Sequence, residues 1–238
     1  MPAQPLSPLT GGLVPPGDDA RPLLTYVEGP ARVELSGSTT ANWVSKTANL
    51  LTDYLGGPGR NGQSGGPERV GLCLPLHWQL PCLLLGAVAT GATVVVASDP
   101  AHLAGCAVAF TTAEDAPAAL DAGVEDVFAC SLTPFATRLA SVPAMAYDAA
   151  VEIPSYGDFF PGRPTQALIE LDGEPFAVPD LDVGPADRVL TSCDPRTADG
   201  LGVLLGALRA GAAVVLLRQG DAAEVAHQES ASRSYSCA

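Results

Sequence analysis

Two stretches of the chain, residues 69–96 and 188–217, repeat one order of apolar and polar positions. Each begins with an arginine and a short apolar run, continues through an aliphatic segment of helical length, turns at a Gly-Ala pair and ends in aliphatic residues. This order predicts strand, helix, tight turn and buried strand, and such a βαβ unit forms a right-handed crossover between parallel strands. Gly91 and Gly211 provide the left-handed residue that ends each helix. The pattern predicts an α/β fold with parallel sheets built from two similar βαβ units.

The segments around the two units are also patterned. Residues 23–35 contain two short extended runs separated by Glu-Gly-Pro, which predicts a hairpin. A helix follows, capped by Ser36 or Ser38 and ended by Gly56, because apolar residues recur at helical spacing in between. Further strands are expected at 107–111, 126–130 and 167–171, and a short helix at 113–122.

Changes in composition divide the chain into parts. We expect a leader at 1–21, a domain at 22–221 with lobes at about 22–140 and 165–221 joined by Pro-rich residues 141–164, and a tail at 222–238. The leader is rich in Pro and Gly and is expected to be flexible, as is a Gly-rich loop at 56–66. The tail ends in Ser-rich sequence without an apolar face, so we expect it to fray.

The formal net charge is -14, from 26 acidic and 12 basic residues. A protein of that charge repels phosphate backbones and anionic lipid, so neither nucleic acid nor a membrane is an expected partner. The longest apolar stretch, residues 80–89, is too short to cross a bilayer, and residues 1–20 do not resemble a targeting signal. We therefore expect a cytoplasmic protein, and its core should be aliphatic because aromatic residues make up only 5% of the chain.

The cysteines give no clear sign of a metal site. Six stand at positions 73, 82, 106, 130, 193 and 237, and no two form a CxxC pair. Most lie in apolar runs, so we interpret them as buried reduced thiols, with zinc or a redox pair as the alternative. The three histidines lack the spacing of metal ligands, and no metal is expected.

The succession of these segments resembles the N-terminal domain of AMP-forming (adenylate-forming) enzymes, such as acyl-CoA synthetases and peptide-synthetase adenylation domains. The resemblance rests on Leu24-Thr25-Tyr26, on the first βαβ unit with its Gly86–Ala92 segment, and on Ala186–Leu190 followed by the second unit. It covers roughly residues 22–221 and implies the fold of the N-terminal subdomains of those ligases. The chain is most similar to a group of short bacterial proteins described as distant homologues of AMP-binding enzymes.

The chain departs from this family at the phosphate loop, a Ser/Thr/Gly-rich run that ends in Pro-Lys-Gly. The resemblance places that loop shortly before Asp187, where residues 167–178 carry three carboxylates and no lysine. Such a stretch repels a triphosphate. The motifs for adenine, Mg²⁺ and ribose, and the domain with the catalytic lysine, would lie beyond residue 238. The chain has one lysine, Lys46, and it lies on the early helix.

Two loops follow the first strand of each unit, where open α/β sheets bind ligands. The first loop contains His77, a candidate general base or hydrogen-bond donor to a ligand, and Trp78. The plainer interpretations are a surface-loop histidine without a role and a tryptophan that packs at the start of the helix.

The second loop contains Asp194, Arg196 and Asp199, which could recognise a polar ligand. In the resembled enzymes this loop lies near the acyl pocket. The plainer interpretation is that Asp194 or Thr197 caps the helix that follows.

These observations favour a non-catalytic domain, a pseudoenzyme that keeps the ligase scaffold and a residual pocket for an acyl or nucleotide-like ligand. We assign no catalytic residue and expect no cofactor, since ATP or AMP would have to bind without the phosphate loop. One alternative is half of a split acyl-adenylate-forming ligase, of the AMP-forming acid–thiol class, that another subunit completes. The other is a protein-interaction module without a small-molecule site, which would bind a protein partner or a second copy.

Overall fold

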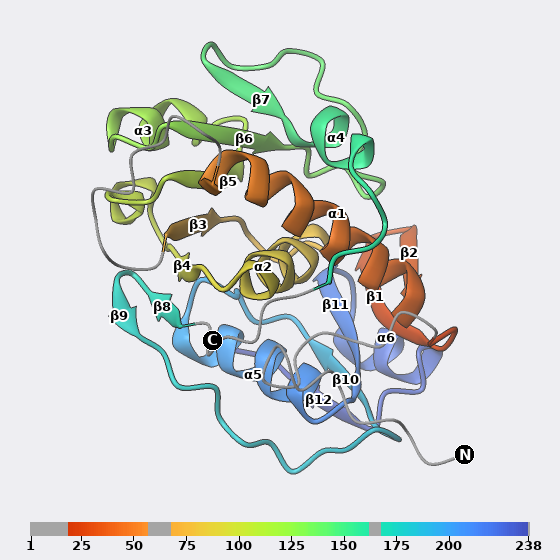
Figure 1. Cartoon of the computed structure of the whole chain (residues 1–238). Coiled ribbons are helices and arrows are strands. Elements are labelled where there is room, and N and C mark those ends of the chain that lie inside the picture. Colours follow the sequence, from red (N-terminus) through yellow and green to blue (C-terminus); the bar gives the residue numbers. More distant parts are fainter. Residues whose placement is uncertain (1–18, 57–67, 162–167, 238) are drawn as a thin grey trace.

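The computed structural model describes residues 19–56, 68–161 and 168–237 (Figure 1). Most of the predicted leader at 1–21 and of the Gly-rich loop at 56–66 lies outside these residues. Two sheets enclose the helices α1 (Gly37–Gly56) and α2 (Gln79–Thr90). All twelve residues of α2 are buried, and one core cluster combines side chains of both helices and both sheets.

The larger sheet has seven strands in the order β7-β6-β5-β3-β4-β8-β9. Their bounds are β3 (Arg69–Cys73), β4 (Thr93–Val96), β5 (Val108–Thr112), β6 (Asp126–Cys130), β7 (Ala146–Asp148), β8 (Ile169–Leu171) and β9 (Glu174–Pro175). All neighbours are parallel except β8 and β9. The short helix α3 (Ala116–Asp121) joins β5 to β6 close to the predicted position.

The smaller sheet has five strands in the order β12-β10-β11-β1-β2. Their bounds are β1 (Pro22–Glu28), β2 (Ala31–Ser36), β10 (Arg188–Thr191), β11 (Ala213–Gln219) and β12 (Arg233–Tyr235). The predicted hairpin is β1 and β2, which pair antiparallel, while the other neighbours are parallel. A helix α5 (Ala198–Arg209) connects β10 to β11.

Both predicted βαβ units are present, as β3-α2-β4 and β10-α5-β11. Gly91 and Gly211 end the helices with φ of 83° and 79°, in the left-handed region that suits glycine. The prediction of an α/β fold with parallel sheets is confirmed. The two units lie in different sheets, and strands from 22–140 and from 165–221 occur in each sheet. The division into lobes remains a prediction.

Helix α1 begins as its sequence predicts, with Ser36 as the cap. The Thr39 N–H donates to Ser36 Oγ at 3.1 Å, which satisfies one of the free amides of the first turn. Helices α1 and α2 cross closely because α2 has a glycine at the contact. A Cβ on Gly86 would lie 2.6 Å from Thr47 Cβ on α1, so even alanine would push the helices apart.

The segment 141–164 was predicted to be a linker without regular structure. Its described residues contain β7, a four-residue helix α4 (Ala149–Glu152) and a 3₁₀ turn η3 (Ile153–Ser155). Elsewhere in the chain, another 3₁₀ turn, η2 (Pro100–Leu103), follows β4. Strand β7 extends the larger sheet because it pairs with β6 in parallel. Three residues are too few to show a period in sequence, so tertiary pairing alone defines this strand.

The tail is ordered, so the expectation that it frays was wrong for residues 222–237. Helix α6 (Ala222–Gln228) packs Val225 into a small core cluster, and β12 pairs in parallel with β10. A disulfide joins Cys237 to Cys193, with the two Cα atoms 4.9 Å apart. The residues after α6 have no apolar face, and backbone pairing and a covalent bond hold them in place. Neither of these interactions can be recognised from a hydrophobic pattern.

The cysteine prediction was correct for four positions and wrong for two. Cys73, Cys82, Cys106 and Cys130 are buried free thiols. Burial raises the pKa of Cys73 and Cys106 to about 11 and also raises that of Cys82 and Cys130, so these thiols stay protonated and unreactive. The other two cysteines form the disulfide.

Two properties concern the described residues only. Within them, no set of three or more His, Cys, Asp and Glu side chains is arranged to hold a metal ion. No helix in the same part of the chain combines the length and apolar character needed to span a bilayer.

Candidate functional site

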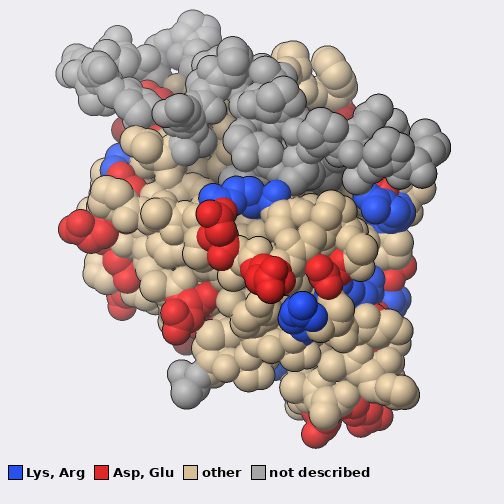
Figure 2. Space-filling view, turned by 90° about the horizontal axis from the view of Figure 1, so that it is seen from below, with Lys and Arg blue, Asp and Glu red and all other residues tan. Residues whose placement is uncertain are grey.

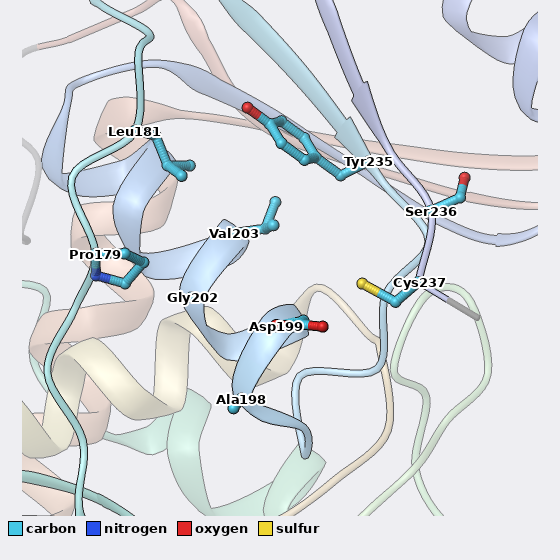
Figure 3. A pocket seen from close by; sticks show the side chains of 9 residues that line it. All are labelled: Pro179, Leu181, Ala198, Asp199, Gly202, Val203, Tyr235, Ser236 and Cys237. Carbon is cyan, nitrogen blue, oxygen red and sulfur yellow. The ribbon is translucent and has the colours of Figure 1, made fainter.

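A groove of about 460 Å³ opens beside the first turns of α5 (Figure 3). Its walls come from α5, from the extended segment 176–183 that follows β9, and from the end of the tail. The lining residues are Pro179, Leu181, Ala198, Asp199, Gly202, Val203, Tyr235, Ser236 and Cys237. This volume falls in the range of small-molecule sites.

Glycines of α5 let the segment 176–183 lie against the helix. A Cβ on Gly206 would stand 2.7 Å from Leu181 Cγ and 2.9 Å from the Pro179 carbonyl oxygen, and a Cβ on Gly202 would stand 3.1 Å from Pro179 Cγ. Glycine within a helix costs about 1 kcal/mol relative to alanine. Close packing of Pro179 and Leu181 offsets that cost here and forms one wall of the groove.

Thr197 caps α5, as one of the plainer interpretations expected. Its Oγ1 accepts a hydrogen bond from the Gly200 N–H at 3.2 Å and donates one to the Asp194 carbonyl at 2.8 Å. The loop folds tightly onto the helix, since a Cβ on Gly200 would come within 1.9 Å of that same carbonyl oxygen. The cap therefore places the first turn of α5 directly beside the loop.

Asp194 and Arg196, two of the predicted ligand-binding residues, bind each other. Arg196 Nη2 lies 2.7 Å from Asp194 Oδ2, and the Arg196 N–H donates to Asp194 Oδ1 at 2.9 Å. Burial disfavours the charged carboxylate, but the hydrogen bonds from Arg196 outweigh it and lower the pKa of Asp194. The pair stabilises the loop, and neither side chain is among those that line the groove.

Asp199 is the one predicted residue that lines the groove. It lies in the first turn of α5, is exposed, and points toward the end of the tail in Figure 3. In Figure 3 the Tyr235 ring extends from the tail toward Leu181, whereas the Ser236 hydroxyl points away from α5. The groove therefore combines the apolar surface of Leu181, Val203 and the Tyr235 ring with one carboxylate, that of Asp199.

His77 is fully buried rather than part of a surface loop. Its Nδ1 accepts a hydrogen bond from the Gln79 N–H at 3.3 Å, and its Nε2 lies 3.2 Å from the Thr133 carbonyl, so Nε2 carries the proton. Burial lowers the pKa of His77 to about 4. The ring of Tyr26 packs against it at 4.7 Å. A neutral, enclosed imidazole that is not among the groove residues is a core side chain.

Trp78 packs at the start of α2, in agreement with its plainer interpretation. It is 4% exposed, and its Nε1 donates to the Pro134 carbonyl at 2.8 Å. Its ring meets that of Trp43 on α1 edge to face, with centroids 5.3 Å apart.

Sequence reasoning missed the two walls that flank α5. The tail was expected to fray, and no helix or strand was predicted for segment 176–183. The one signal of the tail's role was a cysteine, Cys237, close to the end of the chain. Its partner could not be identified from spacing, because 44 residues separate the two cysteines.

A hairpin occupies the place that the resemblance assigns to the phosphate loop. Strands β8 and β9 are joined by Asp172 and Gly173, whose φ values are 52° and 87°. Two successive residues with positive φ are typical of a two-residue hairpin turn. The Asp172 carboxylate accepts hydrogen bonds from the Ser98 N–H at 2.7 Å and from the Ser98 hydroxyl at 2.8 Å, and it contacts His102 Nδ1 at 2.7 Å.

Lys46 is bound to the loop that follows η3. Its ammonium donates to the Tyr156 carbonyl at 2.6 Å and the Pro154 carbonyl at 3.3 Å, and it lies 2.7 Å from Asp158 Oδ1. These three contacts match the three donors of an ammonium group. The lysine therefore holds a loop on α1.

The charges on the face seen from below in Figure 1 are mixed. Figure 2 shows basic side chains interspersed with acidic ones, on a surface that is largely uncharged. The basic residues visible on this face do not form a continuous stripe of the kind that follows a nucleic-acid backbone.

Comparison with known proteins places these features in context. No protein-family model matches the chain. Its fold resembles that of an acyl-CoA synthetase from Brucella canis, with a TM-score of 0.71, 16% identity, and coverage of 91% of this chain and 44% of that one. A benzoate CoA ligase from Burkholderia xenovorans gives a TM-score of 0.58 at 17% identity, with coverage of 89% and 45%. The chain thus spans less than half the length of either ligase.

The fold is that of the N-terminal subdomain of acyl-CoA ligases, as the sequence predicted. A relative that is similar in sequence over most of its length is also known. The "TIGR03089 family protein" of Mycobacterium tuberculosis is 31% identical over 231 residues, which cover 90% of this chain and 91% of that protein. On this identity and coverage, the chain belongs to the TIGR03089 family.

Proposed function

We propose that this chain is a non-catalytic module with a ligase scaffold, which binds a small acyl-type ligand in the groove beside α5. The observation that supports a non-catalytic module is the β8–β9 hairpin. A turn of two residues, with a carboxylate tied to Ser98 and His102, stands where the resemblance expects a phosphate loop.

The electrostatics of this hairpin argue against triphosphate binding. Phosphate sites present free backbone N–H groups and positive charge to the anion. The hairpin presents Asp172 and Glu174 instead, and Glu170 is already paired with Arg69 at 2.7 Å. The net charge of -14 adds a repulsive field around the whole chain.

The contacts of Lys46 argue in the same direction. A lysine that serves adenylation must reach the reacting phosphate, whereas this ammonium is bound to two carbonyls and Asp158. Moving it to another site would leave those acceptors without their donor, which is costly for groups that are partly buried.

The groove supports the second part of the proposal. Leu181, Val203 and the Tyr235 ring offer apolar surface to a chain or ring, and Asp199 offers an acceptor to a donor group on the ligand. A carboxylate at this position disfavours phosphate or CoA nucleotide binding in the groove itself. The ligand class that fits is an acyl group, aliphatic or aromatic, that carries a hydroxyl or amino substituent.

The first experiment is ATP–pyrophosphate exchange by the pure chain with a panel of aliphatic and aromatic carboxylic acids. A full-length AMP-forming ligase serves as the positive control. We expect no exchange above the protein-free background. Exchange by the chain alone would overturn the proposal, and exchange that needs a second protein would instead support half of a split ligase.

The second experiment measures thermal unfolding with hydroxy- and amino-substituted acids, and with ATP and AMP as nucleotide controls. A ligand at about 100 times its Kd stabilises the folded state by about 2.7 kcal/mol, which raises Tm by several degrees. We expect shifts with the acyl compounds and none with ATP. Ala198→Trp, which fills the groove, should abolish the shift, and Ala223→Trp on the exposed surface of α6 is the matched control.

A further inference from the structure

We propose that the Cys193–Cys237 disulfide is a redox latch, which holds the end of the tail in place as one wall of the groove. The inference rests on the groove being the ligand site of the proposed function. It adds a means of regulation: the groove is complete when the disulfide is formed and loses a wall when the bond is reduced.

Residues 232–237 of the tail are attached at both ends, and between these ends lie a short strand and a hydrogen bond from the Ser192 N–H to the Tyr235 carbonyl at 3.1 Å. At its start, the Ser232 hydroxyl donates to Asp187 Oδ1 at 2.7 Å, and the Ser232 N–H donates to the Arg188 carbonyl at 2.8 Å. At its end stands the disulfide. Between them β12 pairs with β10 over three residues only. Without the covalent attachment, a three-residue edge strand is among the first segments of a fold to open.

Opening of the tail would change the groove directly. Tyr235, Ser236 and Cys237 all lie beyond the Ser232 attachment and supply the wall that faces α5. If residues 233–237 swing away about Ser232, Asp199 and Val203 remain on α5 with nothing opposite them. The effect is local, because the other walls belong to α5 and to segment 176–183.

The disulfide is accessible to a thiol on one side. Cys193 is 1% exposed, whereas Cys237 is exposed on the surface. The four remaining cysteines are buried free thiols that burial keeps protonated, so they are poor partners for exchange. The sequence predicts a cytoplasmic protein, and disulfides of reducing compartments are usually transient.

Thiol–disulfide exchange accounts for every atom and electron in the switch. A thiolate of an external dithiol attacks the Cys237 sulfur, the S–S bond breaks, and Cys193 leaves as a thiolate that takes up a proton. The second thiolate of the dithiol attacks the mixed disulfide and releases Cys237 as a thiol. The protein gains two electrons and two protons, and the dithiol becomes a cyclic disulfide.

The test is hydrogen exchange measured by mass spectrometry on the full chain, before and after treatment with dithiothreitol, with thiol counting to verify reduction. Reduction should speed exchange of the β12 amides roughly tenfold or more and leave those of β11 unchanged. Cys237→Ser should exchange like the reduced protein, and dithiothreitol should not change it further. That variant therefore controls for effects of the reductant on the buried thiols. Unchanged β12 exchange in verified reduced protein would overturn the latch.

A binding arm separates failure of the latch from failure of the proposed function. Binding of the hydroxy- or amino-substituted acid that gives the largest thermal shift is measured to the oxidised chain, the reduced chain and Cys237→Ser. We expect roughly tenfold weaker binding to the last two. Equal affinity of all three forms would overturn the claim that the disulfide regulates ligand binding, and it would leave the proposed function intact. If reduction speeds exchange of the β12 amides but no form of the protein binds the ligand, the disulfide holds the tail as proposed. The proposed function as an acyl-binding module is then wrong.

Discussion

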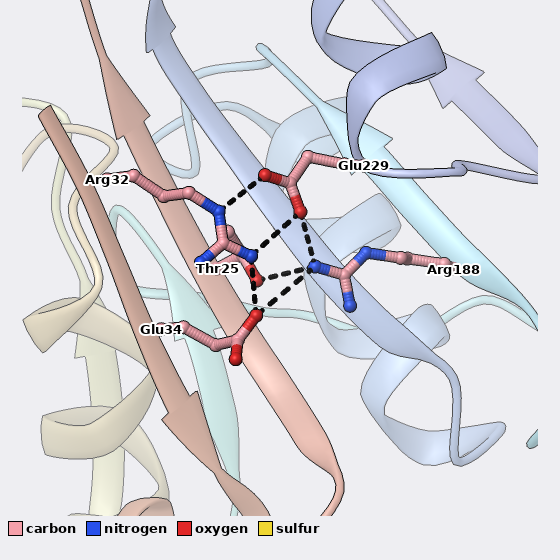
Figure 4. A network of polar contacts seen from close by, with 5 residues as sticks. All are labelled: Thr25, Arg32, Glu34, Arg188 and Glu229. Carbon is pink, nitrogen blue, oxygen red and sulfur yellow. Dashed lines mark hydrogen bonds and ion pairs between the residues drawn. The ribbon is translucent and has the colours of Figure 1, made fainter. Parts of the chain in front are cut away.

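Arg188 on β10 lies 2.7 Å from the carboxylate of Glu229, which stands 41 residues later at the end of α6. The same guanidinium donates to Thr25 on β1 at 2.7 Å, and Arg32 on β2 binds the other Glu229 oxygen at 2.6 Å (Figure 4). One carboxylate, with 9% of its side chain exposed, thus joins β2 and β10 to the end of α6, and Arg188 extends the network to β1. The groove wall begins six residues beyond it, at Tyr235.

The ion pairs of Glu229 make the free energy of unfolding depend on pH in the acidic range. The hydrogen bond from Arg32 is the main cause that lowers the pKa of Glu229. The carboxylate therefore stabilises the folded state fully above the pKa of an unfolded glutamate, about 4.3. That contribution is lost as the pH falls through the lower folded-state value.

Glu229→Gln should lower the free energy of unfolding by about 2 kcal/mol at pH 7, because two guanidinium groups lose an ionised acceptor. Urea titrations at pH 7 and at about pH 3 measure it. The difference between variant and wild type should shrink at the lower pH. An equal difference at both pH values would show that the carboxylate contributes by shape and not by charge.

His77 should control stability in a higher pH window. Its pKa is lowered by burial to about 4, so the unfolded chain takes up a proton at this residue below about pH 6.5 while the folded chain does not. Stability should therefore fall as the pH drops from about 6.5 to about 4, by at most about 3 kcal/mol from this residue.

His77→Gln should flatten that part of the profile, which urea titrations at several pH values would measure. The variant loses stability at pH 7, yet its loss on going from pH 7 to about pH 4.5 should be smaller than that of wild type. A wild-type slope in His77→Gln would contradict the assignment of a neutral, buried imidazole.

Gly206→Ala should lower the free energy of unfolding by about 1–2 kcal/mol. The new Cβ would stand 2.7 Å from Leu181 Cγ and 2.9 Å from a backbone oxygen, so segment 176–183 has to move. Alanine favours a helix by up to about 1 kcal/mol, which offsets part of the loss. Gly202→Ala is the graded comparison, because it meets the same segment less closely, at 3.1 Å from the Pro179 ring, and its loss of stability should be smaller. Equal losses in the two variants would show that the closeness of this contact does not set the loss.

Lys46→Ala should reduce stability by about 1–2 kcal/mol and leave binding of the hydroxy- or amino-substituted acid unchanged. The loss comes mainly from the hydrogen bond to the Tyr156 carbonyl, which is partly shielded from water. Asp158→Ala removes only the ion pair, whose carboxylate is 61% exposed, and should cost no more than about 0.5 kcal/mol. Urea unfolding and calorimetric binding measure both effects. Loss of ligand binding at unchanged stability would contradict a structural role for this lysine.

The amino-acid sequence by itself determined the two βαβ units, the β1–β2 hairpin, the Ser36 cap of α1 and the glycine ends at Gly91 and Gly211. Each depends on residues within one element and its turn, where apolar period and glycine conformation act locally. The resemblance to ligases followed from the order of these local signals, and the structural neighbours share that fold. Of the five predicted site residues, only Asp199 was placed at the groove.

Tertiary structure alone decided the rest. The burial of His77, the pairing of Cys193 with Cys237, and the β12 wall of the groove depend on which distant segments meet. The sequence of a polar loop residue such as His77 does not show whether it faces water or the core. Likewise, the sequence of a Ser-rich tail does not show whether it faces water or pairs with a strand. Their environment is set by contacts across 44 or more residues, as in the disulfide and the Lys46 clamp. No local pattern records such contacts, because their energy arises only when the sheets assemble.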